Sequence, residues 1–458
     1  MFKSTKQRQS LDVTSGPMLG KIFSFAIPII LSGILQQTFS TADTIVVGRG
    51  ASSQALGGVS ACTSLINLII CIFTGLSVGA TVAISQAIGA RDEQRASRCA
   101  HTAIATAIFG GIFLGIVGII ISKPVLKAMG TPEEIIGYSI KYMRIYFAGA
   151  PFLLLYNYGS AILRTVGDTK RPLVFLAIGG IVNVILNFVM VLGLGMDADG
   201  VAIATVTSNV IASGLVFYTL VHSHHVCRIF PGRISISFKE FKRILALGVP
   251  AGIQSGMFSL SNVVLQSSIN SFGAAVVAGN GAAASVDTYA AFVSDGFSQT
   301  AMTFAGQNTG AKKYGRLKTV FWLTNLSGMA MVALVAAIII PFRESVISLF
   351  ISDNPEAVAA GCERLMWVLL PHFIGAAMTI SSSVLRGMGK SLQPMIVTVF
   401  GVCVVRMIWV VTVFEHYKTI RSLYLVYPVT WVLTLAGIVG MFWYSYFKLS
   451  RTGTMGKD

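Results

Sequence analysis

The sequence predicts an all-α polytopic membrane protein with twelve transmembrane helices in two six-helix lobes, and three observations lead to this fold class. First, 54% of the 458 residues are hydrophobic and only 11% are charged, against about 25% charged residues in soluble proteins. Second, apolar runs long enough to cross a bilayer follow one another with short polar connections. Third, the two halves of the chain share motifs in the same order, which indicates an internal repeat.

Twelve apolar runs of helical length are predicted. They span residues 19–48, 55–88, 98–122, 136–163, 173–195, 199–222, 242–270, 275–308, 318–341, 357–385, 393–414 and 422–447. An even number of crossings places both termini on one side of the membrane. Lys and Arg gather mainly in the connections on that side, so the positive-inside rule predicts that both termini are cytoplasmic. The formal net charge of +16 therefore reflects membrane topology and not a nucleic-acid partner.

The repeat consists of motifs that recur at a nearly constant spacing. Pro28 matches Pro250, QAIGA at 86–90 matches QNTGA at 307–311, and SAILRTVG at 160–167 matches SSVLRGMG at 382–389. We therefore expect an N-terminal six-helix lobe at 1–222, a cytoplasmic inter-lobe linker at 223–241 and a C-terminal six-helix lobe at 242–458. Such a duplication suggests two lobes that rock about a central cavity during transport.

The first run contains an aspartate, Asp43, in its second half. An ionisable side chain at the centre of a membrane helix costs about 2.5 to 3.5 kcal/mol, so it needs a partner, a cavity or a proton. At helical spacing Asp43 continues a polar stripe formed by Ser32, Gln36 and Ser40. The functional interpretation is that Asp43 binds a coupling proton or cation in a water-filled cavity. The alternative is a buried, hydrogen-bonded aspartate that only fastens helices together.

Other kinds of chemistry receive no support from the sequence. The six cysteines show neither C-x-x-C nor Cys/His ligand spacing, so we interpret them as small buried hydrophobic residues. His222, His224 and His225 are expected to lie in a solvated loop and not in a metal site. H-E-x-x-H, Walker A and a G-x-S-x-G motif with suitable partners are missing. The chain is therefore not expected to be an enzyme.

Four features together resemble the bacterial multidrug and toxic compound extrusion (MATE) transporters. They are TADTIVVG at 41–48, the paired Q-x-x-G-A connections, LRTVGDTKRP at 163–172 and the asparagines of the fifth run. The resemblance implies a V-shaped fold and secondary active multidrug efflux, in which organic, often cationic and aromatic, compounds are exported by alternating access in antiport with H+ or Na+. It also implies the bacterial inner (cytoplasmic) membrane, contact with the lipid bilayer, drug-like substrates, a monomer, and no cofactor besides the transported ion.

In the MATE family the acid of the first helix is a cation-coupling residue, and this role falls here on Asp43, which would also hold any Na+. Polar residues of the fifth helix share its cavity, and Asn183 and Asn187 stand four apart on one face of that run. An amide can coordinate Na+ or hydrogen-bond either form of a carboxyl. Asn157 and Thr205 are further candidates for this site, with interhelical hydrogen bonding as their alternative role.

The second half lacks the acids that better-known members carry in helices 7 and 10, and His372 stands near one of those positions. The eighth run carries Asp287 and Asp295, and Asp287 is a candidate for a second acid in the cavity. Arg406 is a candidate to neutralise Asp287 or Asp295, and a purely structural ion pair is the alternative. The candidates for the substrate cavity are Gln36, Tyr156, Asp287, Asp295, Met257, Phe292 and Arg406. For the apolar members, a core or lipid-facing position is the alternative.

A flippase for a lipid-linked cell-envelope precursor is the alternative function, because that related class shares the duplicated lobes. Recognition of pyrophosphate favours a cationic central cavity. Arg406 is the only basic residue that the sequence places well inside a predicted helix, which disfavours this alternative.

Overall fold

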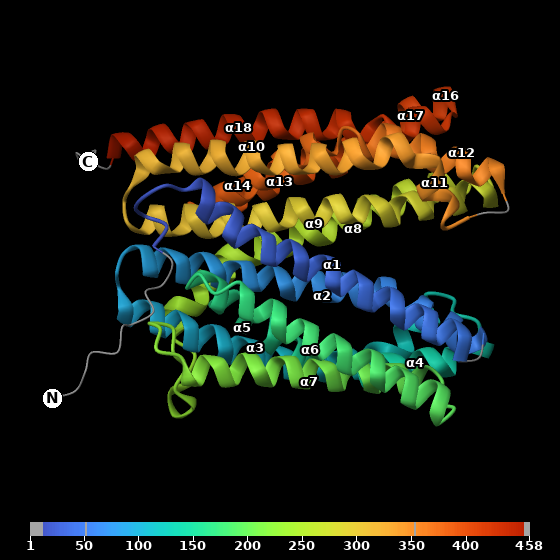
Figure 1. Ribbon diagram of the computed structural model, residues 1–458, viewed down its shortest axis with the longest axis horizontal. Helices are drawn as coiled ribbons and strands as arrows, with labels where there is room; N and C mark the ends of the chain where they lie inside the picture. The colour runs from blue at the N-terminus through green and yellow to red at the C-terminus, as the bar shows by residue number, and fades with distance from the viewer. Residues whose placement is uncertain (1–11, 51–52, 352–353, 453–458) are drawn as a thin grey trace. The chain divides into compact units, whose positions relative to one another are not determined.

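The chain is helical in the part that the structure describes (Figure 1). This computed structural model describes residues 12–50, 53–351 and 354–452, and these ranges contain no β-strand. Each of the twelve predicted runs coincides with one helix or with a group of consecutive helices. The predicted all-α fold class is therefore confirmed.

The first half of the chain forms seven helices, because Gly149 divides the fourth predicted run into two. The helices are α1 (Leu19–Gly50), α2 (Ser53–Gly89), α3 (Glu93–Ala128), α4 (Glu133–Ala148), α5 (Ala150–Thr165), α6 (Lys170–Asn187) and α7 (Ala198–His222). A π-helical segment, Phe188–Gly193, extends α6.

The second half is divided further, because π-helical and 3₁₀ segments interrupt three of its predicted runs. The helices are α8 (Phe238–Asn270), α9 (Ala274–Gly310), α10 (Tyr314–Ile339), α11 (Arg343–Ser348), α12 (Pro355–Arg364), α13 (His372–Gly387), α14 (Leu392–Thr398), α15 (Val405–Trp409), α16 (Glu415–Tyr417), α17 (Ile420–Tyr424) and α18 (Val426–Thr452). The interrupting segments are Ile340–Phe342, Leu365–Leu369, Val399–Val404 and Val410–Phe414.

Many of these helices have the length and composition of membrane spans. Within the described ranges, eight are long and apolar enough to cross a bilayer. The pair Pro355–Leu369 and His372–Gly387 counts as a ninth if its two parts, bent by 43°, form one broken span. The helices α2 and α9 have 37 residues each, about 55 Å at the α-helical rise per residue.

The backbone carries the same repeat as the sequence. Arg91 and Lys312 directly follow the two Q-x-x-G-A motifs, and both have left-handed φ angles, 56° and 58°. Gly167 and Gly389 end the matched L-R motifs with φ angles of 89° and 86°. Positive φ is uncommon for residues other than glycine, so its recurrence at matched lysine and arginine positions shows that both connections turn in the same way.

The described chain separates into two compact units, and the boundary between them follows two prolines. One unit contains residues 31–252, and the other contains residues 13–30 and 253–458. The unit therefore changes two residues after Pro28 in α1 and two residues after Pro250 in α8. A proline inside a helix removes a backbone hydrogen bond and bends the chain. Compared with the lobes expected from sequence, the beginning of α1 packs in the second unit and the beginning of α8 in the first.

In the first unit, α2 and α8 approach closely through glycines. A Cβ atom at Gly75 would lie 2.3 Å from the Gly252 Cα, and one at Gly79 would lie 2.2 Å from the Ile244 carbonyl oxygen. Gly248 in turn faces the backbone of α2. Gly75 and Gly79 are four residues apart in α2, and Gly248 and Gly252 are four apart in α8. This small-x-x-x-small spacing lets membrane helices pack backbone to backbone. Around this contact, α3 packs against α4 and α5, and α6 packs against α7 (Figure 1).

The second unit is built around α9, which packs against α10, α12 and α13. The beginning of α1 completes this unit, because the Phe23 ring meets the edge of Phe297 at a centroid distance of 5.7 Å. Gly296 of α9 lies against Ala26 and Ile30 of α1 and leaves no room for a side chain. The helices α13 and α18 are also packed together.

Candidate functional site

In the first unit, three helices meet at the carboxylate of Asp43. Asn187, at the end of α6, donates a hydrogen bond from Nδ2 to Asp43 Oδ1 at 2.5 Å. Asn187 is fully buried, so this bond is shielded from water. Hydrogen bonds to a charged acceptor contribute about 1.5 to 3 kcal/mol, and the pairing therefore holds the carboxylate in place inside the helix bundle.

Asn183, one helical turn before Asn187, approaches the same carboxylate. Both ends of its amide are satisfied when the nitrogen faces Asp43. The nitrogen then donates to Asp43 Oδ1 at 2.6 Å, and the oxygen accepts from the backbone N–H of Thr205 at 3.3 Å. The Thr205 hydroxyl donates to the Val201 carbonyl oxygen within α7 at 3.0 Å. The structure thus brings together four of the five residues predicted for cation coupling.

One strong acceptor at this site has no partner. The Oδ1 atom of Asn187 is buried and accepts no hydrogen bond from the described residues. A buried polar atom without a partner costs about 1 to 3 kcal/mol. Carboxylate and amide oxygens are ligands for hard cations such as Na+, and a protonated carboxyl can donate to an amide oxygen. The arrangement of Asp43 and Asn187 therefore suits a cation or a proton.

A small apolar plug lies on the side of this site that faces away from the C-terminal end of α7. Val46, Val191 and Val201 form a buried cluster against Tyr142. Val201 is one helical turn from Thr205 in one direction and one turn from Ala198 in the other. The plug therefore separates the asparagine–aspartate site from the residues at the beginning of α7.

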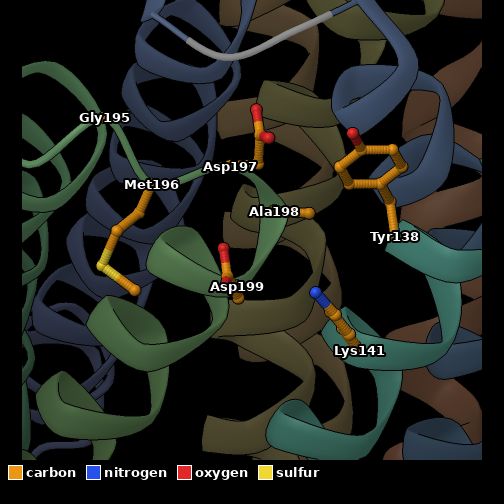
Figure 2. Close-up of a pocket in the computed structure, with 7 residues that line it drawn as sticks. All are labelled: Tyr138, Lys141, Gly195, Met196, Asp197, Ala198 and Asp199. Carbon is orange, nitrogen blue, oxygen red and sulfur yellow. The ribbon is translucent and has the colours of Figure 1, made fainter.

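Beyond the plug, the beginning of α7 lines a pocket of about 280 Å³ (Figure 2). Its charged residues are Lys141 of α4 and the pair Asp197 and Asp199. Figure 2 shows Lys141 and Tyr138 on α4 facing the stretch from Gly195 to Asp199. Two carboxylates and one ammonium group give this pocket an acidic balance, one helical turn outside the valine plug.

The remaining candidates of the first unit have other contacts than Asp43 among the hydrogen bonds of the described residues. Asn157 donates from Nδ2 to the Leu153 carbonyl oxygen of its own helix at 2.9 Å. The Tyr156 hydroxyl donates to the Pro172 carbonyl oxygen at 3.0 Å, and Gln36 is exposed. For Asn157 these contacts favour the alternative interpretation, a structural hydrogen bond.

In the second unit, Asp287 has two partners. The Nδ1 atom of His372 lies 2.9 Å from Asp287 Oδ1, and Arg364 Nη2 lies 3.7 Å from Asp287 Oδ2. Arg406 instead donates from Nη1 to Asn262 Oδ1 at 3.1 Å. The predicted pairing of Arg406 with Asp287 or Asp295 is therefore wrong, because Arg364 and His372 occupy the space around Asp287.

The other substrate-cavity candidates of this unit are dispersed. Asp295 is exposed and accepts a hydrogen bond from Gln299 Nε2 at 2.6 Å. Met257 and Phe292 are half-buried. The Met257 carbonyl oxygen accepts from the Cys403 thiol at 3.3 Å.

Sequence reasoning missed Arg364. This arginine is only 7% exposed and lies inside the predicted run 357–385, as its eighth residue. The argument that Arg406 is the only basic residue well inside a helix is therefore wrong. Arg386 is a third arginine of this unit that lies within a helix, α13. Its Nη2 atom donates to Gln254 Oε1 at 2.7 Å.

Comparisons with known proteins agree with this architecture. The sequence model of the MatE family matches residues 28–189 and again residues 250–412. The chain belongs to the MATE family. The two matches begin 222 residues apart, at Pro28 and Pro250, which confirms the internal repeat. Members of this family are transporters, so the expectation that the chain is not an enzyme is also confirmed.

Individual MATE relatives cover almost the whole chain. The probable multidrug resistance protein YoeA of Bacillus subtilis is 29% identical over 442 residues, which are 93% of this chain and 94% of the relative. The probable multidrug resistance protein NorM of Thermotoga maritima is 25% identical, with 84% of both chains covered. The fold matches a solved outward-facing multidrug resistance MATE transporter of the MOP superfamily, with a TM-score of 0.89, 24% identity and coverage of 97% of this chain and 100% of that chain. These matches favour multidrug efflux over the flippase alternative.

Proposed function

We propose that this MATE transporter exports organic, often cationic or aromatic, compounds in exchange for inward H+ or Na+, with Asp43 as the coupling residue. The observation that carries the proposal is the placement of two asparagine amides on one intramembrane carboxylate, with the Asn187 oxygen left unpaired. An intramembrane acid in such a setting is a functional residue by default. The names of the relatives, which include multidrug resistance proteins, support the substrate class.

The mechanism follows from the charge of the site. A bound proton or Na+ neutralises Asp43, and the empty carboxylate keeps its two amide donors. A cation can drive alternating access only by binding one conformation more tightly than the other. We infer that the site is accessible to the cation from the acidic pocket of Asp197 and Asp199 when the valine plug opens, and that loading allows the drug site to reset.

The location of the protein is part of the same proposal. The two relatives named above are bacterial proteins. The basic residues of the sequence gather in the connections on one side, as the positive-inside rule predicts. We infer a bacterial cytoplasmic membrane with both termini in the cytoplasm. The transporter is proposed to act as a monomer of two six-helix lobes.

The proposal is tested in reconstituted vesicles with ethidium as the substrate. A proton gradient and a Na+ gradient are imposed separately, and each should be compared with a vesicle that has neither. At least one gradient is expected to drive ethidium flux. Asp43→Asn should abolish gradient-driven flux while the protein remains folded in the membrane. The matched control is Glu415→Gln, which removes an exposed acid paired with Lys418 and should keep full flux.

Two results would contradict the proposal. One is the failure of both gradients to move ethidium or any other organic compound. The other is full gradient-driven flux in Asp43→Asn, because the coupling carboxylate would then be dispensable.

A further inference from the structure

The second unit contains a buried cluster of charged and aromatic side chains that the proposed coupling site does not use. We call this group the cationic cluster. Its members are Arg364, Arg406, Asp287, His372 and Tyr427, which come from α12, α15, α9, α13 and α18. Arg364 is 7% exposed and Arg406 is 2% exposed, so both charges are largely removed from water.

Arg364 has partners at the two ends of its guanidinium group. Its Nη1 atom donates to Asn280 Oδ1 at 2.8 Å, and its Nη2 atom pairs with Asp287 at 3.7 Å. The Tyr424 hydroxyl shares the Asn280 oxygen at 3.2 Å. Glu363, the neighbour of Arg364 in sequence, is paired with Arg421 at the exposed surface. Asp287 is therefore the only acid that the ion pairs of the described chain assign to Arg364.

Arg406 has no acidic partner among the described residues. It donates to the neutral amide of Asn262 at 3.1 Å. Its guanidinium carbon lies 4.5 Å from the centre of the Tyr427 ring, and that of Arg364 lies 5.7 Å from the centre of the same ring. The two guanidinium groups therefore both lie over the same aromatic ring.

The cluster carries an excess of positive charge. Two guanidinium groups face one carboxylate, and His372 adds either no charge or a further positive one. The Nε atoms of Arg364 and Arg406 are both buried and have no hydrogen-bond partner in the described chain. An unmatched buried charge is strongly destabilising, so an anionic group that accepts from these two Nε atoms would relieve the cluster. Arginine forks match phosphate and carboxylate geometry.

The cluster also has an aromatic border. The Trp431 ring lies 5.3 Å from the His372 ring and 5.8 Å from the Tyr427 ring, measured between ring centres. Tyr424 is fully buried beside Arg364. Aromatic side chains stack on flat ring systems, so the neighbourhood suits a compound that joins an aromatic ring to an anionic group.

We propose that the cationic cluster binds the anionic group, phosphate or carboxylate, of an aromatic substrate. This inference rests on the proposed export function for its biological role, and it adds aromatic compounds with an acidic substituent to the substrates of that function. Arg406 supplies the unpaired cation, Arg364 supplies a second donor, and Asp287 keeps the net charge low while the site is empty.

The test compares two flavins that differ only in charge. Flavin mononucleotide has the ring system of riboflavin with a phosphate monoester added, so a difference in binding reports on the phosphate alone. Equilibrium binding to the full chain in lipid nanodiscs is followed by flavin fluorescence anisotropy. Flavin mononucleotide is expected to bind about tenfold or more tightly than riboflavin, as for one charge-assisted contact. Inorganic pyrophosphate should displace flavin mononucleotide from the unmodified protein and leave riboflavin in place.

Variants assign the effect to the cluster. Arg406→Gln is expected to weaken binding of flavin mononucleotide about tenfold and to change riboflavin binding less than about twofold. Arg406→Lys keeps the charge without the planar fork and should restore part of the affinity. Arg421→Gln is the matched control, because it removes an exposed arginine from the same unit and should change neither flavin.

Equal affinity for the two flavins, or no binding of flavin mononucleotide, overturns the inference. So does a lack of competition by pyrophosphate, and this measurement needs no variant, so it remains decisive if Arg406→Gln fails to fold. The export proposal is judged separately by gradient-driven ethidium flux. Ethidium flux together with equal affinity for the two flavins would reject the anion site and keep the antiport proposal. Tighter binding of flavin mononucleotide without any ethidium flux would keep the anion site and reject the antiport proposal.

Discussion

Replacement of Asn187 by leucine separates the two possible coupling ions. The leucine side chain has the same number of heavy atoms and the same branching as asparagine, so Asn187→Leu removes the amide at a fully buried position while the branched shape is kept. Two interactions disappear together. One is the 2.5 Å hydrogen bond that Asn187 donates to Asp43. The other is the contact that the unpaired Asn187 Oδ1 atom could make with a bound cation.

The loss acts on a proton and on Na+ in opposite directions. Protonation removes the charge of Asp43, so the amide donor stabilises mainly the empty, ionised state. A hydrogen bond to a charged group is worth about 1.5 to 3 kcal/mol, which corresponds to about 10- to 150-fold in proton affinity. The variant should therefore hold its proton more tightly. Half-maximal proton-driven transport is expected to move upward by about 1 to 2 pH units.

For Na+ the carboxylate stays ionised whether the site is empty or loaded, so the lost donor has nearly the same effect on both states. The lost amide oxygen then decides the outcome, because leucine offers no ligand. Removal of a group that supports a metal site typically costs about 10- to 100-fold in affinity. The Na+ concentration for half-maximal transport should rise by that factor.

The assay is gradient-driven ethidium flux in reconstituted vesicles, with pH varied in the absence of Na+ and Na+ varied at fixed pH. The matched control is Asn209→Leu, which removes a half-buried amide four residues beyond Thr205 on α7. The control is expected to behave like the unmodified protein. If Asn187→Leu changes neither the pH profile nor the Na+ dependence, the contact between Asn187 and Asp43 has no part in coupling and the reasoning fails.

Two further predictions concern packing and thiol chemistry. Gly79→Ala should lower the melting temperature of the purified protein in detergent, because the new Cβ would lie 2.2 Å from a backbone oxygen of α8 and overpacking costs about 1 to 3 kcal/mol. The control is Gly214→Ala, whose Cβ would meet open space. Equal melting temperatures of the two variants would contradict the prediction. Cys227 is buried in the connection before α8, and burial raises the pKa of its thiol to about 12. Since the thiolate is the reactive form, Cys227 should resist maleimide at pH 8 in the folded protein and react after denaturation, as read by mass spectrometry; rapid labelling of the folded protein would refute this.

Much of the fold was predictable because a membrane imposes a simple rule on sequence. Each crossing needs about 20 apolar residues, so the twelve runs were visible as hydropathy alone and each coincides with helical structure. The repeat was visible because proline and glycine mark backbone geometry. The matched positions Gly167 and Gly389 have nearly the same positive φ.

The sites were less predictable, because contacts between distant helices leave little trace in local sequence. The site at Asp43 could be found since Asn183 and Asn187 are rare residue types in an apolar run and share one helix face. Arg364 was missed because it stands near the beginning of its run, where basic residues commonly reach toward the membrane surface. Only the packing of α9, α12 and α13 shows that it is buried beside Asp287.

The repeat keeps the backbone but not the chemistry of the two halves. At the 222-residue spacing of Pro28 and Pro250, Asp43 corresponds to Leu265, which is 1% exposed and apolar. Since the second half has no acid at that position, it cannot reproduce the carboxylate of the first half. A carboxylate at this position of the repeat is therefore confined to the N-terminal half.

A basic residue follows the opposite course. The Pro-Glu pairs at 132–133 and 355–356 are 223 residues apart, and at that spacing Lys141 corresponds to Arg364. Lys141 is exposed and lines a pocket with two aspartates, whereas Arg364 is buried with a single one. The same backbone position thus carries a compensated surface charge in one half and a buried cation in the other. If both proposals hold, this difference would let one protein bind a coupling cation in one half and an anionic substrate group in the other, without competition for a single site.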